Sequence, residues 1–235
     1  MLLTPLFSLL LACAAHADDP HLQPRIFLDP GHGAEGNPGN TNAGCDSEQD
    51  VMLTLALAVK ERLVERGAEV RLSREPGQRV SYDDRLSAAA DWKADVFVSL
   101  HSDVRAVSEQ QCPSLVGNEG FSILWGSDAE DPELPKACQG LAQRVGQRMA
   151  SAGFVPFRGD TYGDIYAEDA QVPGVFLDTH KPHQRIKVLR RASMPSVIVE
   201  THHAWVADEV ALWEQPVVVL AFADALYQGV SDHLR

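Results

Sequence analysis

The chain has 235 residues, of which 45% are hydrophobic and 23% are charged, and its formal net charge is −13 at pH 7. This length and composition are typical of one globular domain with a core of its own. A strongly acidic chain lacks the basic face that nucleic acids and anionic membranes attract, so we expect neither as a partner.

Residues 1–17 have the pattern of a secretory signal sequence. Leu2 to Ala12 form an apolar core, and Ala15-His16-Ala17 resembles a cleavage site of the A-x-A type. The apolar stretch is too short to span a bilayer, so no transmembrane helix is predicted. A second interpretation is a lipoprotein signal that anchors the chain through Cys13, because Leu10-Leu11-Ala12-Cys13 is similar to a lipobox. Both interpretations predict a periplasmic or secreted protein.

After a polar leader at residues 18–24, one domain is predicted over residues 25–235, in which strand-like and helix-like segments alternate. Short β-branched and aromatic runs predict strands, and apolar residues at helical spacing predict helices. This alternation predicts a single layered α/β domain with a mainly parallel, twisted sheet of about six strands flanked by helices. The predicted strands are 25–29, 68–73, 95–100, 120–125, 175–177, 186–189 and 196–200, and the predicted helices are 48–66, 81–92, 132–152 and 217–234.

Three predicted strands end in side chains that can bind a metal ion or transfer a proton. His32 lies in the turn Asp29-Pro30-Gly31-His32-Gly33 after the first strand, His101 ends the third strand, and Glu200 ends the last. Ligands of open α/β sheets bind beyond the carboxyl ends of the strands, so we expect these side chains to meet at one site. Glu48 opens the first predicted helix, where its carboxylate can face the same edge.

His32, Glu48 and His101 together form the His₂Glu ligand set of a catalytic zinc site. Zinc would lower the pKa of a bound water and polarise a carbonyl, and Glu200 would act on that water as general base and acid. Asp29 is a candidate for orienting His32. Taken singly, each residue also fits an ordinary structural role: a hydrogen-bonded histidine, a carboxylate at a helix start, or the buried partner of an arginine.

Three cysteines follow the predicted signal sequence, an odd number for an oxidising compartment. Cys138 falls on the apolar stripe of the predicted helix 132–152, which predicts a buried free thiol. Cys45 and Cys112 lie in polar loops at the edge of the expected site. We hypothesise that these two form a disulfide.

Five segments in a fixed order extend this interpretation. They are Asp29 to Gly33, the glycine-rich stretch 36–44 leading to Glu48, Val70-Arg71-Leu72-Ser73-Arg74, Ala94-Asp95-Val96-Phe97-Val98-Ser99-Leu100-His101, and Pro195-Ser196-Val197-Ile198-Val199-Glu200. In this order and spacing they resemble the zinc-dependent N-acetylmuramoyl-L-alanine amidases of the amidase_3 type, which cut bacterial peptidoglycan. The resemblance covers nearly all of residues 25–234.

This resemblance implies a site and a reaction. It implies that His32, Glu48 and His101 bind Zn²⁺ and that Glu200 is catalytic. The implied reaction is hydrolysis of the amide bond between the lactyl group of N-acetylmuramic acid and L-Ala of the stem peptide, which makes peptidoglycan the expected substrate.

The sequence departs from the family pattern at a few positions. Asp91 and Asp103 stand where many relatives have Asn. Thr201-His202-His203 follows the proposed catalytic Glu200, where Thr-Gly-Phe is commoner. His202 and His203 are therefore weighed as substrate contacts or as competing metal ligands.

The loops around the expected site bear on access to it. The loop after His101 leaves little room for the inserted regulatory helix that covers zinc in divisome-associated relatives, so we predict an open site that requires no activator protein. His180 and His183 lie in another polar loop and are interpreted as surface or substrate-groove residues. An open groove suits a large polymeric substrate, so we favour a monomer.

Two alternative functions remain open from the sequence. The first is another zinc peptidase of peptidoglycan, such as a carboxypeptidase, which would release a terminal amino acid instead of whole stem peptides. The second is a peptidoglycan-binding protein without catalysis, which we would expect to have lost at least one of the four chemical positions.

Overall fold

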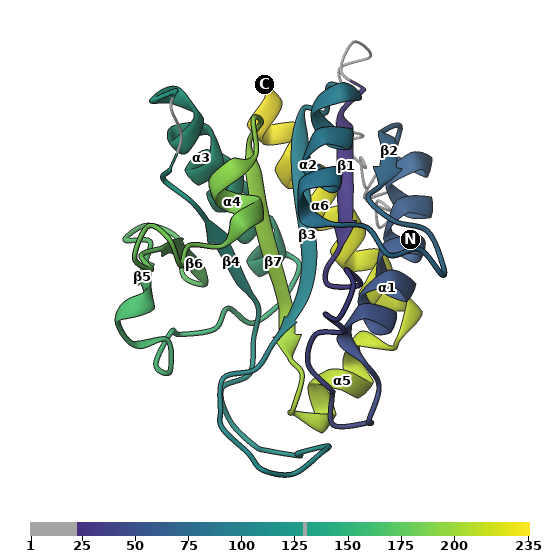
Figure 1. The fold of residues 1–235 in the computed structure, drawn as a ribbon, viewed down its shortest axis with the longest axis vertical. Coiled ribbons are helices and arrows are strands. Elements are labelled where there is room, and N and C mark those ends of the chain that lie inside the picture. Colours follow the sequence, from purple (N-terminus) through teal and green to yellow (C-terminus); the bar gives the residue numbers. More distant parts are fainter. Residues whose placement is uncertain (1–22, 129–130) are drawn as a thin grey trace, which may run out of the picture.

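The centre of the fold is formed by three buried, mostly apolar strands that run parallel to one another. They are β1 (Arg25–Pro30), β3 (Val96–Asp103) and β7 (Ser196–His203). Parallel strands that are covered on both faces are expected to contain continuous apolar runs, as these strands do at 26–28, 96–98 and 197–199. The structure is a computed structural model that describes residues 23–128 and 131–235, and Figure 1 shows these strands at its centre.

The complete sheet has seven strands in the order β2-β1-β3-β7-β4-β6-β5. The outer strands are β2 (Glu69–Leu72), β4 (Ser122–Trp125), β5 (Tyr166–Glu168) and β6 (Val175–Asp178). The first four strands of this order are parallel, whereas β4 runs antiparallel to β7 and β5 antiparallel to β6. The predicted single α/β domain with a mainly parallel sheet is therefore confirmed.

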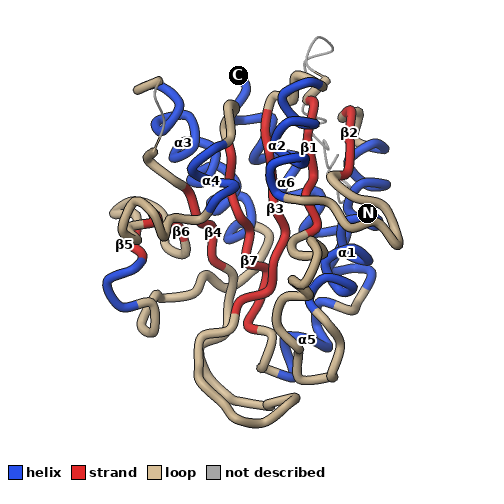
Figure 2. Tube along the Cα trace, viewed as in Figure 1, coloured by secondary structure: helices blue, strands red, loops and turns tan. Residues whose placement is uncertain are grey.

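Three long helices cover one face of the sheet (Figure 2). They are α1 (Glu48–Glu65), α3 (Glu133–Ser151) and α6 (Pro216–Leu234). Alternate strand residues, such as Leu28 and Val98, pack with these helices in the larger part of the hydrophobic core. The three corresponding helix predictions are confirmed to within one or two residues.

Two shorter helices, α2 (Tyr82–Asp91) and α4 (Lys187–Arg191), pack on the other face. Phe27 and Phe97 point to this side, where they join the smaller part of the core. In Figure 1 the carboxyl ends of β3 and β7 extend beyond α2 and α4. The residues at these strand ends are therefore not covered by the helices of this layer.

The strand predicted at 186–189 is wrong, because this segment belongs to helix α4. Its two buried residues, Val188 and Leu189, are adjacent in sequence, and an apolar run this short does not distinguish a strand from a helical turn. The sequence interpretation also missed β5, helix α5 (Ala207–Trp213) and the short 3₁₀ helix Gly163–Ile165.

The predicted signal sequence, including Cys13, and most of the leader lie outside the described residues. Within the described ranges no single helix is long and apolar enough to cross a bilayer. Helices α5 and α6 reach that length and hydropathy only when taken together, and the two are bent by 76° at the break between them.

One disulfide joins the two loops that flank the carboxyl end of the sheet. Cys45, in the β1–α1 loop, is bonded to Cys112, in the β3–β4 loop, at a sequence separation of 67 and a Cα–Cα distance of 5.2 Å. Cys138 is a free thiol buried in α3, beside Ser196. The hypothesised disulfide and the predicted buried thiol are both present.

Candidate metal centre and active site

Two glycines allow the backbone to approach the functional side chains closely. A Cβ atom on Gly31 would lie 2.5 Å from the His101 ring, and one on Gly39 would lie 2.6 Å from a carboxylate oxygen of Glu48. Between them the chain turns sharply at His32, whose φ of 58° is in the left-handed region that few residues other than glycine adopt. Glycine at these two positions therefore lets the loop after β1 pack directly against the side chains of Glu48 and His101.

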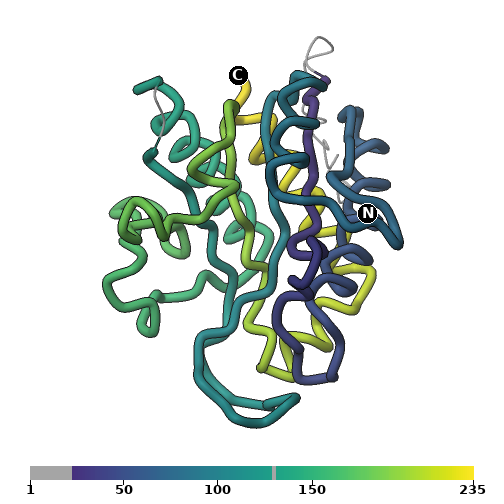
Figure 3. Tube along the Cα trace, viewed as in Figure 1, coloured from purple at the N-terminus to yellow at the C-terminus, as the bar shows by residue number. Residues whose placement is uncertain are grey.

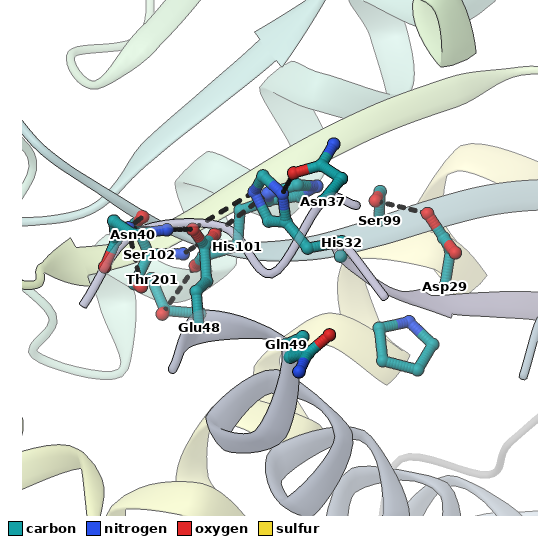
Figure 4. A network of polar contacts seen from close by, with 12 residues as sticks. Asp29, His32, Asn37, Asn40, Glu48, Gln49, Ser99, His101, Ser102 and Thr201 are labelled. Carbon is teal, nitrogen blue, oxygen red and sulfur yellow. Dashed lines mark hydrogen bonds and ion pairs between the residues drawn. The ribbon is translucent and has the colours of Figure 1, made fainter. Parts of the chain in front are cut away.

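The structure brings His32, Glu48 and His101 into one cluster (Figure 4). His32 Nε2 lies 3.1 Å from one carboxylate oxygen of Glu48, and His101 Nδ1 lies 3.0 Å from the other. Each residue offers one ligand atom, and these atoms all lie within 4.8 Å of one another. Donors at such separations can bind a single ion placed between them.

Glu48 is held by backbone and amide donors as well as by the two imidazoles. Asn40 donates its backbone N–H and its side-chain amide to Oε2, and the backbone N–H of Ser102 donates to Oε1. Burial raises the pKa of Glu48, but the hydrogen bonds from His101 and then His32 outweigh it and lower the pKa well below its ordinary value. The carboxylate is therefore ionised and fixed in position.

The orientation of His32 is set by Asn37. The Asn37 amide donates to the Tyr82 hydroxyl, so its carbonyl oxygen faces His32 and accepts from Nδ1, 2.8 Å away. Nε2 is therefore the ring nitrogen that faces Glu48, and it donates to the carboxylate when the ring is protonated. In the neutral ring Nε2 would carry the lone pair that a metal ion takes. Burial lowers the pKa of His32, but the hydrogen bond and charge of Glu48 more than compensate, and the pKa is raised overall.

The prediction that Asp29 orients His32 is wrong. The Asp29 carboxylate accepts from Ser73, Ser99 and Arg85, and has no hydrogen bond to His32 among the described residues. Arg85 is fully buried and also donates to the backbone carbonyl of His32. Asp29 thus acts on the turn only indirectly, through a buried arginine on α2.

Glu200 lies opposite His101 in the register of β7 and β3. Its Oε2 atom is buried and has no hydrogen-bond partner in the described part of the chain. Burial, followed by the negative charges of Asp103 and Glu48, raises the pKa of Glu200 well above its ordinary value. A carboxyl group in this environment binds a proton more readily than an ordinary, solvent-exposed glutamate does.

Asp103, whose charge acts on Glu200, belongs to a network of polar side chains. Asp103 accepts from the Tyr162 hydroxyl and from Arg105, whose guanidinium is buried and lies 3.9 Å over the Phe157 ring. Burial, followed by the charge of Asp103, raises the pKa of Tyr162 strongly. The Tyr162 hydroxyl is therefore a neutral donor that keeps the Asp103 carboxylate in place.

The other singled-out histidines and Asp91 lie outside the three-residue cluster. His202 and His203 are buried, and His202 stacks on Trp213 with ring centroids 5.8 Å apart. His180 donates from Nδ1 to the Asp178 carboxylate, and its ring lies 5.3 Å from that of Tyr166. His183 and Asp91 are exposed. A competing ligand role for His202 or His203 therefore finds no support in the geometry.

The types of side chain in the cluster can be compared with the ligands that zinc prefers. Two imidazoles and one ionised carboxylate supply three ligands of the kinds that zinc takes, and a tetrahedral ion would keep a fourth position for water or substrate. The outer residues Asn37 and Asn40 fix the orientation of these ligands, as metal sites require. The residues present therefore fit such an ion.

Comparisons with known proteins agree with this geometry. The family model described as "Amidase_3: N-acetylmuramoyl-L-alanine amidase" matches residues 26–232. The N-acetylmuramoyl-L-alanine amidase CwlM of Bacillus licheniformis is 31% identical over 180 residues, which are 75% of this chain and 55% of that protein. The chain thus spans only about half the length of this relative.

Two solved structures share the fold. The catalytic domain of the amidase CwlV from Bacillus (Paenibacillus) polymyxa var. colistinus superposes with a TM-score of 0.65 at 21% identity, covering 90% of this chain and 98% of that one. The apo form of the amidase Ami1 from Mycobacterium abscessus superposes with a TM-score of 0.69 at 19% identity, covering 91% of this chain and all of that one. At these identities the likeness shows the fold alone.

Proposed function

Because this chain belongs to the Amidase_3 family of N-acetylmuramoyl-L-alanine amidases, we propose that it hydrolyses the amide bond between N-acetylmuramic acid and L-Ala of the peptidoglycan stem peptide. The observation that carries the proposal is the meeting of His32, Glu48 and His101 at the carboxyl end of the sheet, with Glu200 paired opposite His101. All four chemical positions are occupied, which favours an enzyme over a binding protein that has lost catalysis.

His32, Glu48 and His101 would hold a zinc ion. Zinc bound there would supply a Lewis acid for the substrate carbonyl and would lower the pKa of a bound water to about 7. The protein's own contribution is rigidity: Asn37 holds the His32 ring, while Asn40 and the Ser102 backbone hold Glu48.

Glu200 would transfer the proton. Its raised pKa suits a general base that takes a proton from the attacking water and then gives it to the leaving nitrogen of L-Ala. Its Oε2 atom, which no described residue engages, would be free to accept that proton. The neighbouring Asp103 carboxylate is fixed by Tyr162 and Arg105, so its charge acts on Glu200 from a constant position.

We further propose that the site is open and needs no activator. The β3–β4 loop, all of which is described, contains no helix that could cover the cluster, and the Cys45–Cys112 disulfide ties this loop to the β1–α1 loop. The enzyme would act as a monomer on its polymeric substrate.

Export of the protein is part of the same proposal. The substrate lies outside the cytoplasm, and a disulfide persists in oxidising compartments. We propose that residues 1–17 direct export, that 18–24 are a leader and that 25–235 form the catalytic domain. The mature protein would be periplasmic or secreted, and lipid anchoring at Cys13 is the alternative to be tested.

The decisive experiment is digestion of purified peptidoglycan by residues 18–235, with mass spectrometry of the products. We expect intact stem peptides with an amino-terminal L-Ala, lost on chelation and restored by zinc. Release of a single terminal amino acid would instead identify a carboxypeptidase. Binding to peptidoglycan without any product, in the presence of zinc, would identify a non-catalytic protein.

A further inference from the structure

A groove of about 550 Å³ lies between α1 and the pair α5–α6. These helices lie close together in Figure 1 and belong to the sheet face opposite α2 and α4. The floor and walls of the groove are mostly apolar, and Leu220 on its rim is 46% exposed. The apolar side chains include Met52, Leu55, Val210, Trp213, Val219 and Leu220.

The rim of this groove is acidic. Five exposed carboxylates line it, and no Lys or Arg is found among the described residues that form it. Arg62 on α1 and Arg66, which directly follows α1, are both paired with Asp224 on α6. Arg62 also pairs with Glu65 of the rim. The rim carboxylates are Asp46, Asp50, Glu61, Glu65 and Glu214.

We propose that this groove binds an amphipathic helix of a partner protein, with an apolar face flanked by Lys and Arg. An apolar groove accepts the apolar face of such a helix, and the acidic rim complements its basic flanks. The rim extends from Asp46 to Glu65 alongside α1, whose 18 residues span about 27 Å. This length accommodates about five turns of a partner helix.

Charge distinguishes this occupant from two others. A second copy of this chain carries the same net charge of −13, so it would bring an acidic surface to an acidic rim. An anionic lipid surface would be repelled by the same carboxylates, since basic segments are what such surfaces attract.

The inference goes beyond the proposed activity, because the groove and the metal-binding cluster are separate. The groove is lined mainly by α1, α5 and α6, together with Asn42, Asp46 and His202. None of the three cluster residues is among its lining residues, and neither is Glu200. Binding in the groove can thus be measured on a chain with no catalytic activity.

The test uses a labelled 18-residue helical peptide of Leu and Lys with all leucines on one face, and a scrambled peptide of the same composition. Fluorescence anisotropy with the domain at physiological salt should show the amphipathic peptide binding at least about tenfold more tightly than the scrambled one. The double variant Glu61→Lys/Glu214→Lys and the single variant Leu220→Ser should each weaken this binding by about fivefold or more.

A matched control separates the groove from the net charge. Glu75→Lys/Glu109→Lys changes two exposed carboxylates elsewhere and alters the net charge equally, so it should leave the binding nearly unchanged. Equal binding of both peptides, or equal loss in both double variants, would overturn the proposal. So would self-association in sedimentation, or binding to vesicles of anionic lipid, that the Leu220→Ser variant abolishes.

Discussion

His101 and Glu200 are directly opposite each other in the register of the adjacent parallel strands β3 and β7. Paired residues of neighbouring strands point to the same face, and a slip of one residue would turn Glu200 to the other face of the sheet. The register of two buried strands therefore places the proposed proton carrier beside a proposed metal ligand. Single substitutions that leave this register intact should therefore distinguish proton transfer by Glu200 from metal binding by His101.

We expect Glu200→Gln to abolish most activity while leaving metal binding intact. General acid–base catalysis contributes about 10²- to 10⁴-fold, so kcat should fall by that factor. Peptide release and zinc content measured on the same preparation test this. The exposed Glu119→Gln is a control that should retain both. A Glu200→Gln enzyme with near-normal kcat would remove Glu200 from the mechanism.

Replacing a cluster residue should lower the zinc content as well as the activity, unlike Glu200→Gln. His32→Ala, Glu48→Ala and His101→Ala should each lower the zinc content from one ion per chain towards zero, and activity should fall with it. A ligand that binds only the native state raises stability by mass action, so zinc should raise the Tm of the unaltered domain but not of these variants. Retention of one zinc in all three variants would place the metal elsewhere.

The sequence identified the cluster and Glu200 because three of these four residues stand at strand ends or directly after them. Chain order alone predicts that such ends converge. It could not identify Asn37 or Arg85 as supports, because their partners are set by how a Gly-rich loop and a buried arginine fold against distant residues. Asp29 was misassigned for the same reason: two serines and Arg85 surround its carboxylate.

The fold shows the same limit. Apolar residues that repeat at helical spacing over a long segment predicted α1, α3 and α6 well, because each of these helices buries a stripe of many residues. Segments with few buried residues, such as α4 with two and β5 with none, take their conformation from the surfaces they pack on.

Asn37→Ala should weaken metal binding without removing a ligand. The variant leaves His32 Nδ1 without its acceptor, and loss of such outer partners costs about 10- to 100-fold in metal affinity. Competition with a chelator of known affinity measures this. Tyr82→Phe, which removes only the hydroxyl that fixes the Asn37 amide, should have a smaller effect in the same direction. An unchanged affinity in Asn37→Ala would show that the His32 orientation does not depend on this bond.

The Cys45–Cys112 disulfide should stabilise the domain. Removing a disulfide that closes a long loop costs about 2–4 kcal/mol in the free energy of unfolding. Urea unfolding of Cys45→Ser/Cys112→Ser should therefore show a lower midpoint than the oxidised domain. Cys138→Ala serves as a control, because this thiol forms no disulfide in the structure. A double variant as stable as the parent would show that the loops are held by their other contacts.

His202 should make the domain less stable in acid. Burial, followed by the nearby positive charge of Arg105, lowers the pKa of His202 from 6.5 to about 3. Below pH 6.5 the unfolded chain binds a proton that the native chain does not, so the free energy of unfolding falls as the pH drops from 6.5 towards 3. Above pH 6.5 the native state loses no stability through His202. Between pH 6.5 and pH 3 the free energy of unfolding changes by at most about 1.4 kcal/mol per pH unit because of this group.

His202→Gln should remove this slope, which urea unfolding between pH 7 and pH 4 can measure as the difference from the parent domain at each pH. His183→Gln replaces an exposed histidine and should follow the parent. The comparison of slopes matters more than stability at a single pH, because the substitution also removes the stacking of His202 on Trp213. Parallel pH profiles for the parent and His202→Gln would mean that the buried imidazole accepts a proton in the native state.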